Sequence, residues 1–233
     1  MDEKKTANIT IECLASQATI SKVELRQKSA FALQHLMAAA RFSRLCGEVQ
    51  ERNKNKQLGP FYDEQIAYVS ATIMLCVASI ESNINEYLSE PTILFPELNS
   101  NAQNELCSLI GSLSIIDKYQ KVLSSKGIEI FGRGKQPLQD IEVIISLRNE
   151  LVHFHPEWHD EQERHEKLGN KLRGKFELSP FITEHSGVLF PQRIISHGCT
   201  KWAVQKTIEF LDEFCFKLGM DSKLDNLRGY LHA

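Results

Sequence analysis

The sequence predicts an all-α protein, an antiparallel helical bundle of four to five long helices with a small loop or hairpin insertion before the last helix. Apolar residues recur at helical spacing over several long stretches, and breaks that contain proline or glycine separate these stretches. Long helices joined by short breaks bury their apolar faces by packing side by side. The chain contains no internal repeat and no low-complexity segment, which excludes a repeat architecture.

The composition supports one globular domain. The 233 residues are 42% hydrophobic and 24% charged, which excludes a disordered chain, a collagen-like chain and a membrane bundle. The net charge of -3 excludes a strongly basic nucleic-acid coat but allows a local basic patch. No apolar run reaches the ~18 residues that a membrane span needs, and the N-terminus carries no secretory signal. The six cysteines are scattered without a CxxC pair, so we predict free thiols, a cytoplasmic location and no membrane partner.

The first part of the chain contains a polar segment and two predicted helices. Residues 1–28 alternate weakly and predict a polar N-terminal arm or a short strand. A helix is predicted from Ser29, which would cap it, to the polar run at residues 51–56. A second, long helix is predicted from about Tyr62 to Leu88.

The second part contains the remaining helices. A third is predicted over about residues 100–123, and a fourth opens at Pro137 and ends near Phe154. The charged stretch 157–175 predicts a surface helix, and a last helix runs over about residues 200–218 with Gly219 as its C-terminal cap. The predicted domains are an arm over 1–28, a bundle over 29–219 with an insertion at about 157–198, and a tail over 220–233.

The fourth helix carries the strongest functional signal. Its apolar residues cover an arc of roughly 200°, about twice the stripe of an ordinary surface helix, which predicts burial in the bundle or against a second subunit. Arg148 lies inside this arc, where an unpaired charge costs several kcal/mol. It should therefore pair with a carboxylate, for example Glu81 or Asp117, or face a solvated cleft. Asn149 and His153 are four residues apart and share one face.

The segment SerLeuArgAsnGluLeuValHis, residues 146–153, resembles the signature of the HEPN superfamily, the helical domains named for higher eukaryotes and prokaryotes nucleotide-binding. In that signature four to six residues separate an arginine, often followed by asparagine, from a histidine. Arg148, Asn149 and His153 match it with a four-residue spacer. The segment 77–87 is similar to an earlier helix of the family, and the predicted bundle is compatible with its fold.

The resemblance implies a metal-independent endoribonuclease without a cofactor, in which two motifs of a homodimer meet in one cleft. His153 would transfer the proton of the RNA 2′-hydroxyl, Arg148 would stabilise the phosphoryl charge, and Asn149 would orient either group. The implied roles are a toxin, silenced by an antitoxin or regulatory protein, or an antiviral or abortive-infection effector. The alternative is a non-catalytic module that binds RNA, a nucleotide or a partner protein.

Further residues after the motif are candidates for RNA binding. His155 and Trp158 can stack on a base, although for Trp158 we favour packing on the end of the bundle. Lys171 and Arg173 belong to a basic cluster that either contacts phosphates or forms a solvated face. Glu81 is a candidate supporting residue that pairs with Arg148 or influences His153.

A metal site is the other hypothesis for this segment. His153, His155 and His159 lie close to Asp160, but Pro156 interrupts the helical spacing that would bring them together. We therefore predict that no metal is bound. The sequence also lacks the GxxxxGK[ST], GxSxG, HExxH and GxGxxG motifs, so it gives no support to the enzyme classes that use them.

Overall fold

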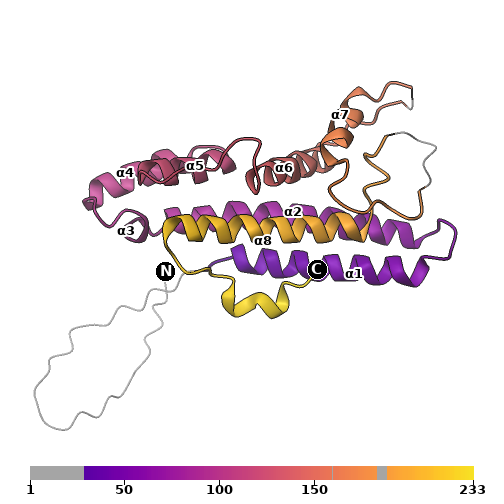
Figure 1. Cartoon of the computed structure of the whole chain (residues 1–233), viewed down its shortest axis with the longest axis horizontal. Helices are drawn as coiled ribbons and strands as arrows, with labels where there is room; N and C mark the ends of the chain where they lie inside the picture. The colour runs from indigo at the N-terminus through magenta and orange to yellow at the C-terminus, as the bar shows by residue number, and fades with distance from the viewer. Residues whose placement is uncertain (1–28, 159, 183–187) are drawn as a thin grey trace, which may run out of the picture.

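The structure is a computed structural model that describes residues 29–158, 160–182 and 188–233. The predicted N-terminal arm, residues 1–28, lies outside these residues. The described part of the chain is all-α and contains no strand (Figure 1). Its α-helices are α1 (Ala32–Asn53), α2 (Phe61–Leu88), α3 (Pro91–Leu94), α4 (Ser100–Gly111), α5 (Ile115–Ser125), α6 (Leu138–Val152), α7 (Glu163–Leu172) and α8 (His197–Leu218).

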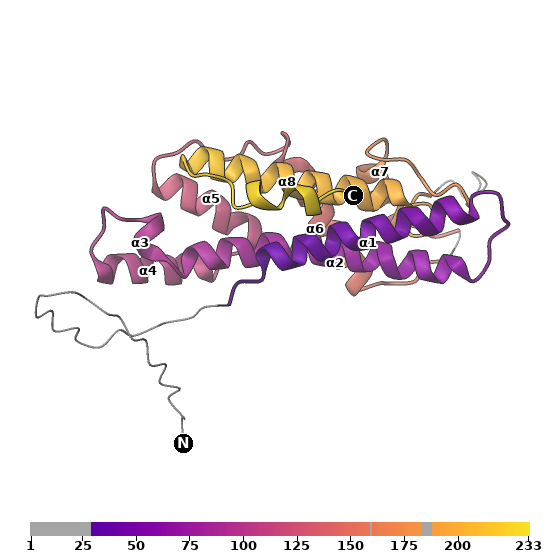
Figure 2. The ribbon, with the colours of Figure 1, turned by 90° about the horizontal axis from the view of Figure 1, so that it is seen from below.

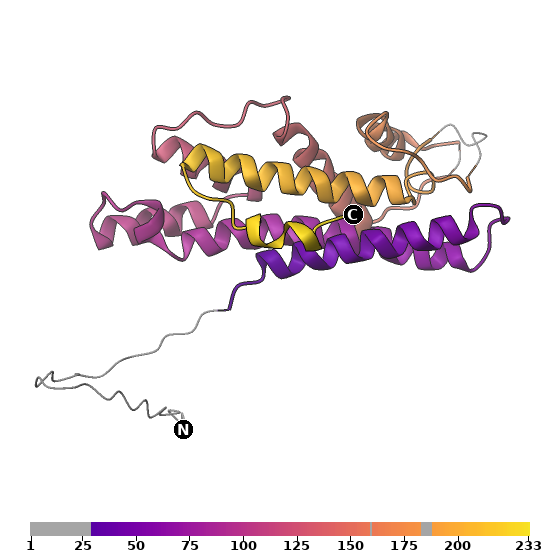
Figure 3. The same ribbon diagram turned by 60° about the horizontal axis from the view of Figure 1, so that its bottom comes forward.

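The long helices α1, α2 and α8 form the body of the bundle. α1 and α2 pack as an antiparallel pair along most of their length, and α8 lies beside both (Figures 1 and 2). α6 packs on α2 and α8, while α4 and α5 cover one end of α2. α7 contacts α6 near the other end of the bundle (Figure 3). This arrangement places the last turn of α6 and the whole of α7 at the same end of the molecule.

The predicted helices are found with several changed boundaries. The predicted third helix is two helices, because Ser114 caps a new start: its side chain accepts a hydrogen bond from the Asp117 N–H at 3.4 Å. α8 begins at His197, earlier than predicted, because Ser196 accepts from the Cys199 N–H. Gly219 has a φ of 68° and is the predicted C-terminal cap.

The insertion and the tail also contain helical structure. The charged stretch forms the surface helix α7, and the insertion has no strand within residues 157–158, 160–182 and 188–198, so the hairpin alternative has no support there. The tail contains the short 3-10 helix η2 (Asp225–Tyr230), which packs against α1. Arg44 of α1 donates hydrogen bonds to the Tyr230 and His232 carbonyls and fastens this tail.

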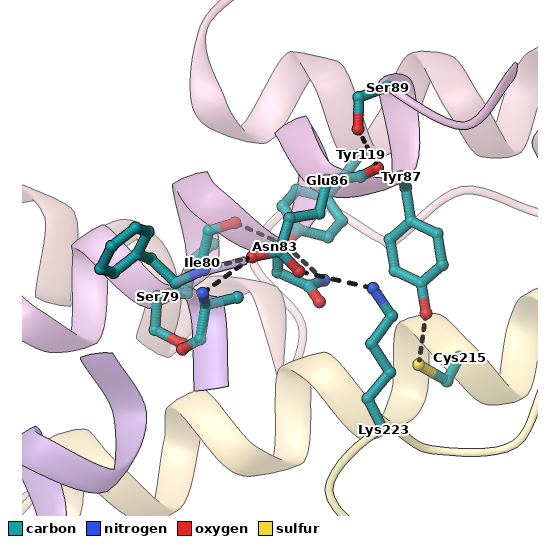
Figure 4. A network of polar contacts seen from close by, with 11 residues as sticks. Ser79, Ile80, Asn83, Glu86, Tyr87, Ser89, Tyr119, Cys215 and Lys223 are labelled. Atoms are coloured by element: carbon teal, nitrogen blue, oxygen red, sulfur yellow. Dashed lines mark hydrogen bonds and ion pairs between the residues drawn. The ribbon is translucent and has the colours of Figure 1, made fainter. Parts of the chain in front are cut away.

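Buried polar side chains connect α2 to its neighbours (Figure 4). The Ser79 hydroxyl donates to the Ala32 carbonyl of α1 at 2.7 Å. The Tyr119 hydroxyl of α5 donates to the Ile80 carbonyl at 2.7 Å and accepts from Asn83 at 3.1 Å. Buried polar groups are stable only when they are paired, so these bonds fix how α1 and α5 sit on α2.

The N-terminus of α1 is capped by a residue from α2. Glu86 accepts hydrogen bonds from the Phe31 and Ala32 N–H groups at 2.9 and 2.8 Å, and Lys223 lies 3.6 Å from its other oxygen. Ser29 does not cap the helix, so that prediction is wrong. The Glu86 carboxylate caps the helix instead, because it accepts hydrogen bonds from two free N–H groups and its negative charge is attracted to the positive end of the helix dipole.

α2 is the most apolar of the long helices. Its length and composition would suffice to cross a membrane, with a mean hydropathy of 1.3 over its best 18-residue window, 44% of which is buried. In this structure the apolar side chains of α2 pack against α1, α6 and α8, as expected of a core helix.

Three buried cysteines lie near one another where α1, α2 and α8 meet. Burial raises the pKa of Cys46 and of Cys76 to about 12, although hydrogen bonds with Thr200 and Thr207 oppose the shift. Burial raises the pKa of Cys199 as well, and the neighbouring thiols Cys46 and Cys76 add to the effect. All three are free thiols and remain protonated at neutral pH.

The Glu86 cap leads to a stability prediction. We expect Glu86→Ala to lower the free energy of unfolding by about 1–2 kcal/mol, because the first turn of α1 loses its acceptor. Urea unfolding followed by circular dichroism measures the change. Glu97→Ala, which removes an exposed carboxylate, should have little effect. Equal stabilities of the two variants would contradict the capping role.

Candidate functional site

The three residues of the motif lie at the end of α6. Arg148 and Asn149 lie within the last five residues of this helix, and His153 is the residue at which the helix stops. The His153 N–H donates to the Asn149 carbonyl at 2.8 Å, so the helical spacing of these two residues is kept. The ideal helical rotation of about 100° per residue places His153 next to Asn149 and places Arg148 further round the helix.

Arg148 is half-buried and forms no ion pair with a carboxylate of the described residues. Its Nε is buried and makes no hydrogen bond to any residue that the structure describes. Neither Glu81 nor Asp117 forms the expected ion pair: Asp117 instead accepts from the Ser114 hydroxyl at 2.6 Å. Glu81 is half-buried on α2 without a hydrogen bond to Arg148, so its supporting role does not take the predicted form.

The wide apolar face of α6 is only partly covered. Ile141, Ile144 and Leu147 are fully buried in the bundle. Of the apolar residues that follow, Leu151 is half-buried, while Val152 is 49% and Phe154 45% exposed. The predicted burial within the bundle therefore holds for the start of α6, and the alternative, burial against a second subunit, stays a prediction for its end, where the motif lies.

A pocket of about 430 Å³ lies between α6 and α7. Asn149 and Lys171, which are both predicted site residues, line it together. Arg148 and His153 do not line it, and Arg173 lies just beyond it, with its guanidinium donating to Asn170 at 3.4 Å. The other lining residues are Ser146, Glu150, Glu157, Glu163, Arg164, Lys167 and Leu168.

Charged side chains of both signs line this pocket. Arg164 donates to Glu150 at 2.7 Å and so joins α7 to α6. Lys167 donates to Glu163 at 2.6 Å, which lowers the pKa of Glu163 and raises that of Lys167. Lys171 is exposed and has no ion-pair partner in the described ranges. Exposed ion pairs contribute little and exchange partners easily, so these cations can turn to an anionic ligand.

Trp158 and His155, the two residues predicted to stack on a base, have different surroundings. Trp158 is 78% exposed, so it does not pack on the bundle end and is free to stack on a base. His155 is exposed as well, but its carbonyl lies 3.0 Å from Nε2 of His165. Within the described residues no group of three or more His, Cys, Asp or Glu side chains has a metal-binding arrangement, and His159 lies outside them.

Glu157 and His165, which were not selected from the sequence, hold the segment after α6. The Glu157 carboxylate accepts from the His165 N–H at 2.9 Å and from the Arg164 N–H at 3.2 Å, and so caps α7. These hydrogen bonds, above all the one from His165, lower the pKa of Glu157. The sequence signal for this cap was an acidic residue, Glu157, before the charged stretch that forms α7. Glu157 lies six residues before the start of α7, which does not follow a known capping pattern.

The comparisons with known proteins give no relative: no protein-family model, no curated protein and no solved structure matches the chain significantly. The HEPN resemblance therefore rests on Arg148, Asn149 and His153 and on their place at the end of a core helix.

The cap on α7 predicts a pH-dependent stability. The pKa of Glu157 in the folded protein lies below its ordinary value of 4.5, so its stabilising effect is complete above that value and is lost as the pH falls through the lower, folded-state pKa. We expect Glu157→Gln to lower the free energy of unfolding near neutral pH, and the difference from wild type to shrink below about pH 4.

Urea unfolding at several pH values measures this difference. Glu166→Gln changes an exposed carboxylate on the same helix and serves as the matched control, with little expected effect. A difference between wild type and Glu157→Gln that grows toward acidic pH would show that the cap is not a stabilising carboxylate.

Proposed function

We propose that the protein is a metal-independent endoribonuclease with Arg148, Asn149 and His153 as its catalytic residues. The observation that carries the proposal is the Nε of Arg148, which is buried without a hydrogen-bond partner among the described residues, together with the exposed side chains of Asn149 and His153 at the same end of α6. A buried donor without an acceptor costs about 1–3 kcal/mol, and a charged one costs more. A phosphate bound at this arginine would supply the acceptor that the folded chain lacks.

The chemistry follows from the three side chains. The 2′-oxygen of the RNA attacks the adjacent phosphorus while the bond to the 5′-oxygen breaks. A histidine side chain can accept the proton of the 2′-hydroxyl or donate one to the leaving oxygen near neutral pH. The Arg148 guanidinium stabilises the charge on the phosphoryl oxygens, and Asn149 orients the phosphate or the imidazole. The products are a 2′,3′-cyclic phosphate and a 5′-hydroxyl.

A second copy of the chain completes the site in this proposal. The cleavage step needs one group to accept a proton and another to donate one, and each chain brings a single motif histidine. The exposed Val152 and Phe154 flank His153 and offer apolar surface that a second copy can cover. A homodimer across the end of α6 would bring two histidines to one cleft.

The pocket between α6 and α7 is the proposed path of the RNA beside the catalytic residues. Asn149 belongs to both, so a strand bound at the motif can continue past Arg164, Lys167 and Lys171. Such cations contact phosphates without selecting sequence. The exposed Trp158 gives a face for stacking an unpaired base.

The proposed biological role is a cytoplasmic toxin or an antiviral or abortive-infection effector. The proposed contacts are to phosphates, a 2′-hydroxyl and a base face, which many RNAs share. An enzyme of low selectivity harms its own cell unless an antitoxin or another regulatory protein restrains it, and RNA and that protein are therefore its proposed partners.

The central test is cleavage of single-stranded RNA in the presence of EDTA. We expect wild type to cut RNA into products with a 2′,3′-cyclic phosphate, and we expect His153→Ala to cut about 100- to 10,000-fold more slowly. Arg148→Lys should also be slower, because lysine keeps the charge but cannot bind a phosphate in the bidentate manner. Oligonucleotides with 2′-deoxyribose throughout should remain intact.

His232→Ala is the matched control, since it removes an exposed histidine on the C-terminal tail. Wild type that cuts no RNA under any condition, or His153→Ala that cuts as fast as wild type, would exclude the proposed activity. A non-catalytic binding module would then be the remaining candidate, and RNA binding without cleavage would identify it.

The proposed RNA path gives a second prediction. Trp158→Ala should raise KM by about 5- to 150-fold with little change in kcat, because stacking on one base contributes about 1–3 kcal/mol. Lys171→Ala and Arg173→Ala should weaken RNA binding. The slope of the logarithm of the binding constant against the logarithm of the salt concentration should become shallower by about 0.7 for each phosphate that is no longer neutralised. Lys54→Ala, at the residue that follows α1, is the control, and an equal effect of that variant would contradict a localised path.

A further inference from the structure

His165 of α7 is buried against the segment that follows the motif. The histidine is 2% exposed, and its ring stacks on Phe154 with centroids 5.4 Å apart. The ring of Phe190 meets it edge-on at 5.1 Å. Nε2 lies 3.0 Å from the His155 carbonyl oxygen, and Nδ1 lies 3.5 Å from a carboxylate oxygen of Glu157.

These contacts reach three of the four residues that directly follow His153. Phe154 is held by its ring, His155 by its carbonyl and Glu157 by its carboxylate, which also binds the N–H of His165. His153 ends α6 and keeps one backbone hydrogen bond to that helix. The direction in which the chain leaves His153 is therefore set by its contacts with His165.

The hydrogen-bonding partners define which nitrogen carries a proton. A carbonyl oxygen only accepts, so Nε2 must be the donor to His155. Nδ1 then faces the Glu157 carboxylate and makes no hydrogen bond within the described residues. The charged groups next to this pair include Arg164, which is itself paired with Glu150, and the Glu163 and Lys167 side chains near the Glu157 carboxylate. His165 thus connects α7 to the segment after α6 through one hydrogen bond, to His155, and one ring contact, with Phe154. Its other ring contact is with Phe190, in the stretch before α8.

We propose that His165 is a positioning residue for His153: it holds the backbone of residues 154–157 so that the His153 side chain is presented in one orientation. This inference rests on the proposed ribonuclease function for its catalytic consequence. It also makes a structural statement that can be tested without any cleavage. Small displacements of a catalytic group strongly reduce the rate, so removing the hydrogen bond from His165 should affect kcat rather than RNA binding.

Two substitutions separate the roles of the ring and of its nitrogen. His165→Phe keeps an aromatic ring between Phe154 and Phe190 but leaves the His155 carbonyl without a donor. His165→Gln restores an N–H at the position of Nε2. We expect His165→Phe to lower kcat by up to about 100-fold with little change in KM, and we expect His165→Gln to recover part of that activity. His35→Phe on α1 is the matched control.

The order parameters of the backbone amides provide the second measurement. For His153 to His155 we expect them to fall in His165→Phe from about 0.85 to below about 0.6, and to be unchanged in His35→Phe. A folded His165→Phe protein with unchanged order parameters would overturn the proposal, and so would an unchanged kcat in an active enzyme. If wild type cuts no RNA while the order parameters fall as expected, the holding role of His165 is supported and the ribonuclease proposal alone fails.

Discussion

The burial of α2 is the constraint on which the rest of the structure depends. This helix packs against α1, α3, α4, α5, α6 and α8. The buried side chains of Ser79 and Asn83 need hydrogen-bond partners, and other helices provide them. Ser79 finds the Ala32 carbonyl and Asn83 finds Tyr119, while Glu86 caps α1 (Figure 4). Meeting these requirements sets the positions of α1 and α5 along α2.

The sequence predicted the long helices well because their signals are local. The apolar spacing within the helix located α2, and the glycine cap at Gly219 located the end of α8. The cap on α1 was missed because its donor groups and Glu86 are more than fifty residues apart in the chain. The split between α4 and α5 was missed because the apolar spacing continues across it, and only Ser114 marks the new start.

The site shows the same division between local and tertiary information. The four-residue spacing of Asn149 and His153 was predictable, and the helix keeps it up to its last residue. What surrounds Arg148 was not predictable, since burial depends on how α6 packs on α2 and α8. The pocket beside Asn149 lies where the contacts of His165 and the exposed Arg164–Glu150 ion pair join α7 to the end of α6. The two residues of each contact are far apart in the sequence, so no spacing pattern could have indicated these contacts.

The three buried thiols between α1, α2 and α8 have a consequence for how the protein responds to oxidants. Peroxide and alkylating reagents attack the thiolate, and the raised pKa of Cys46 and Cys76 keeps both in the inert protonated form. The proposed catalytic residues include no thiol, so oxidative stress would spare both the core and the site. Modification of these cysteines requires the three central helices to separate, and the rate of alkylation would therefore report how often the centre of the bundle opens.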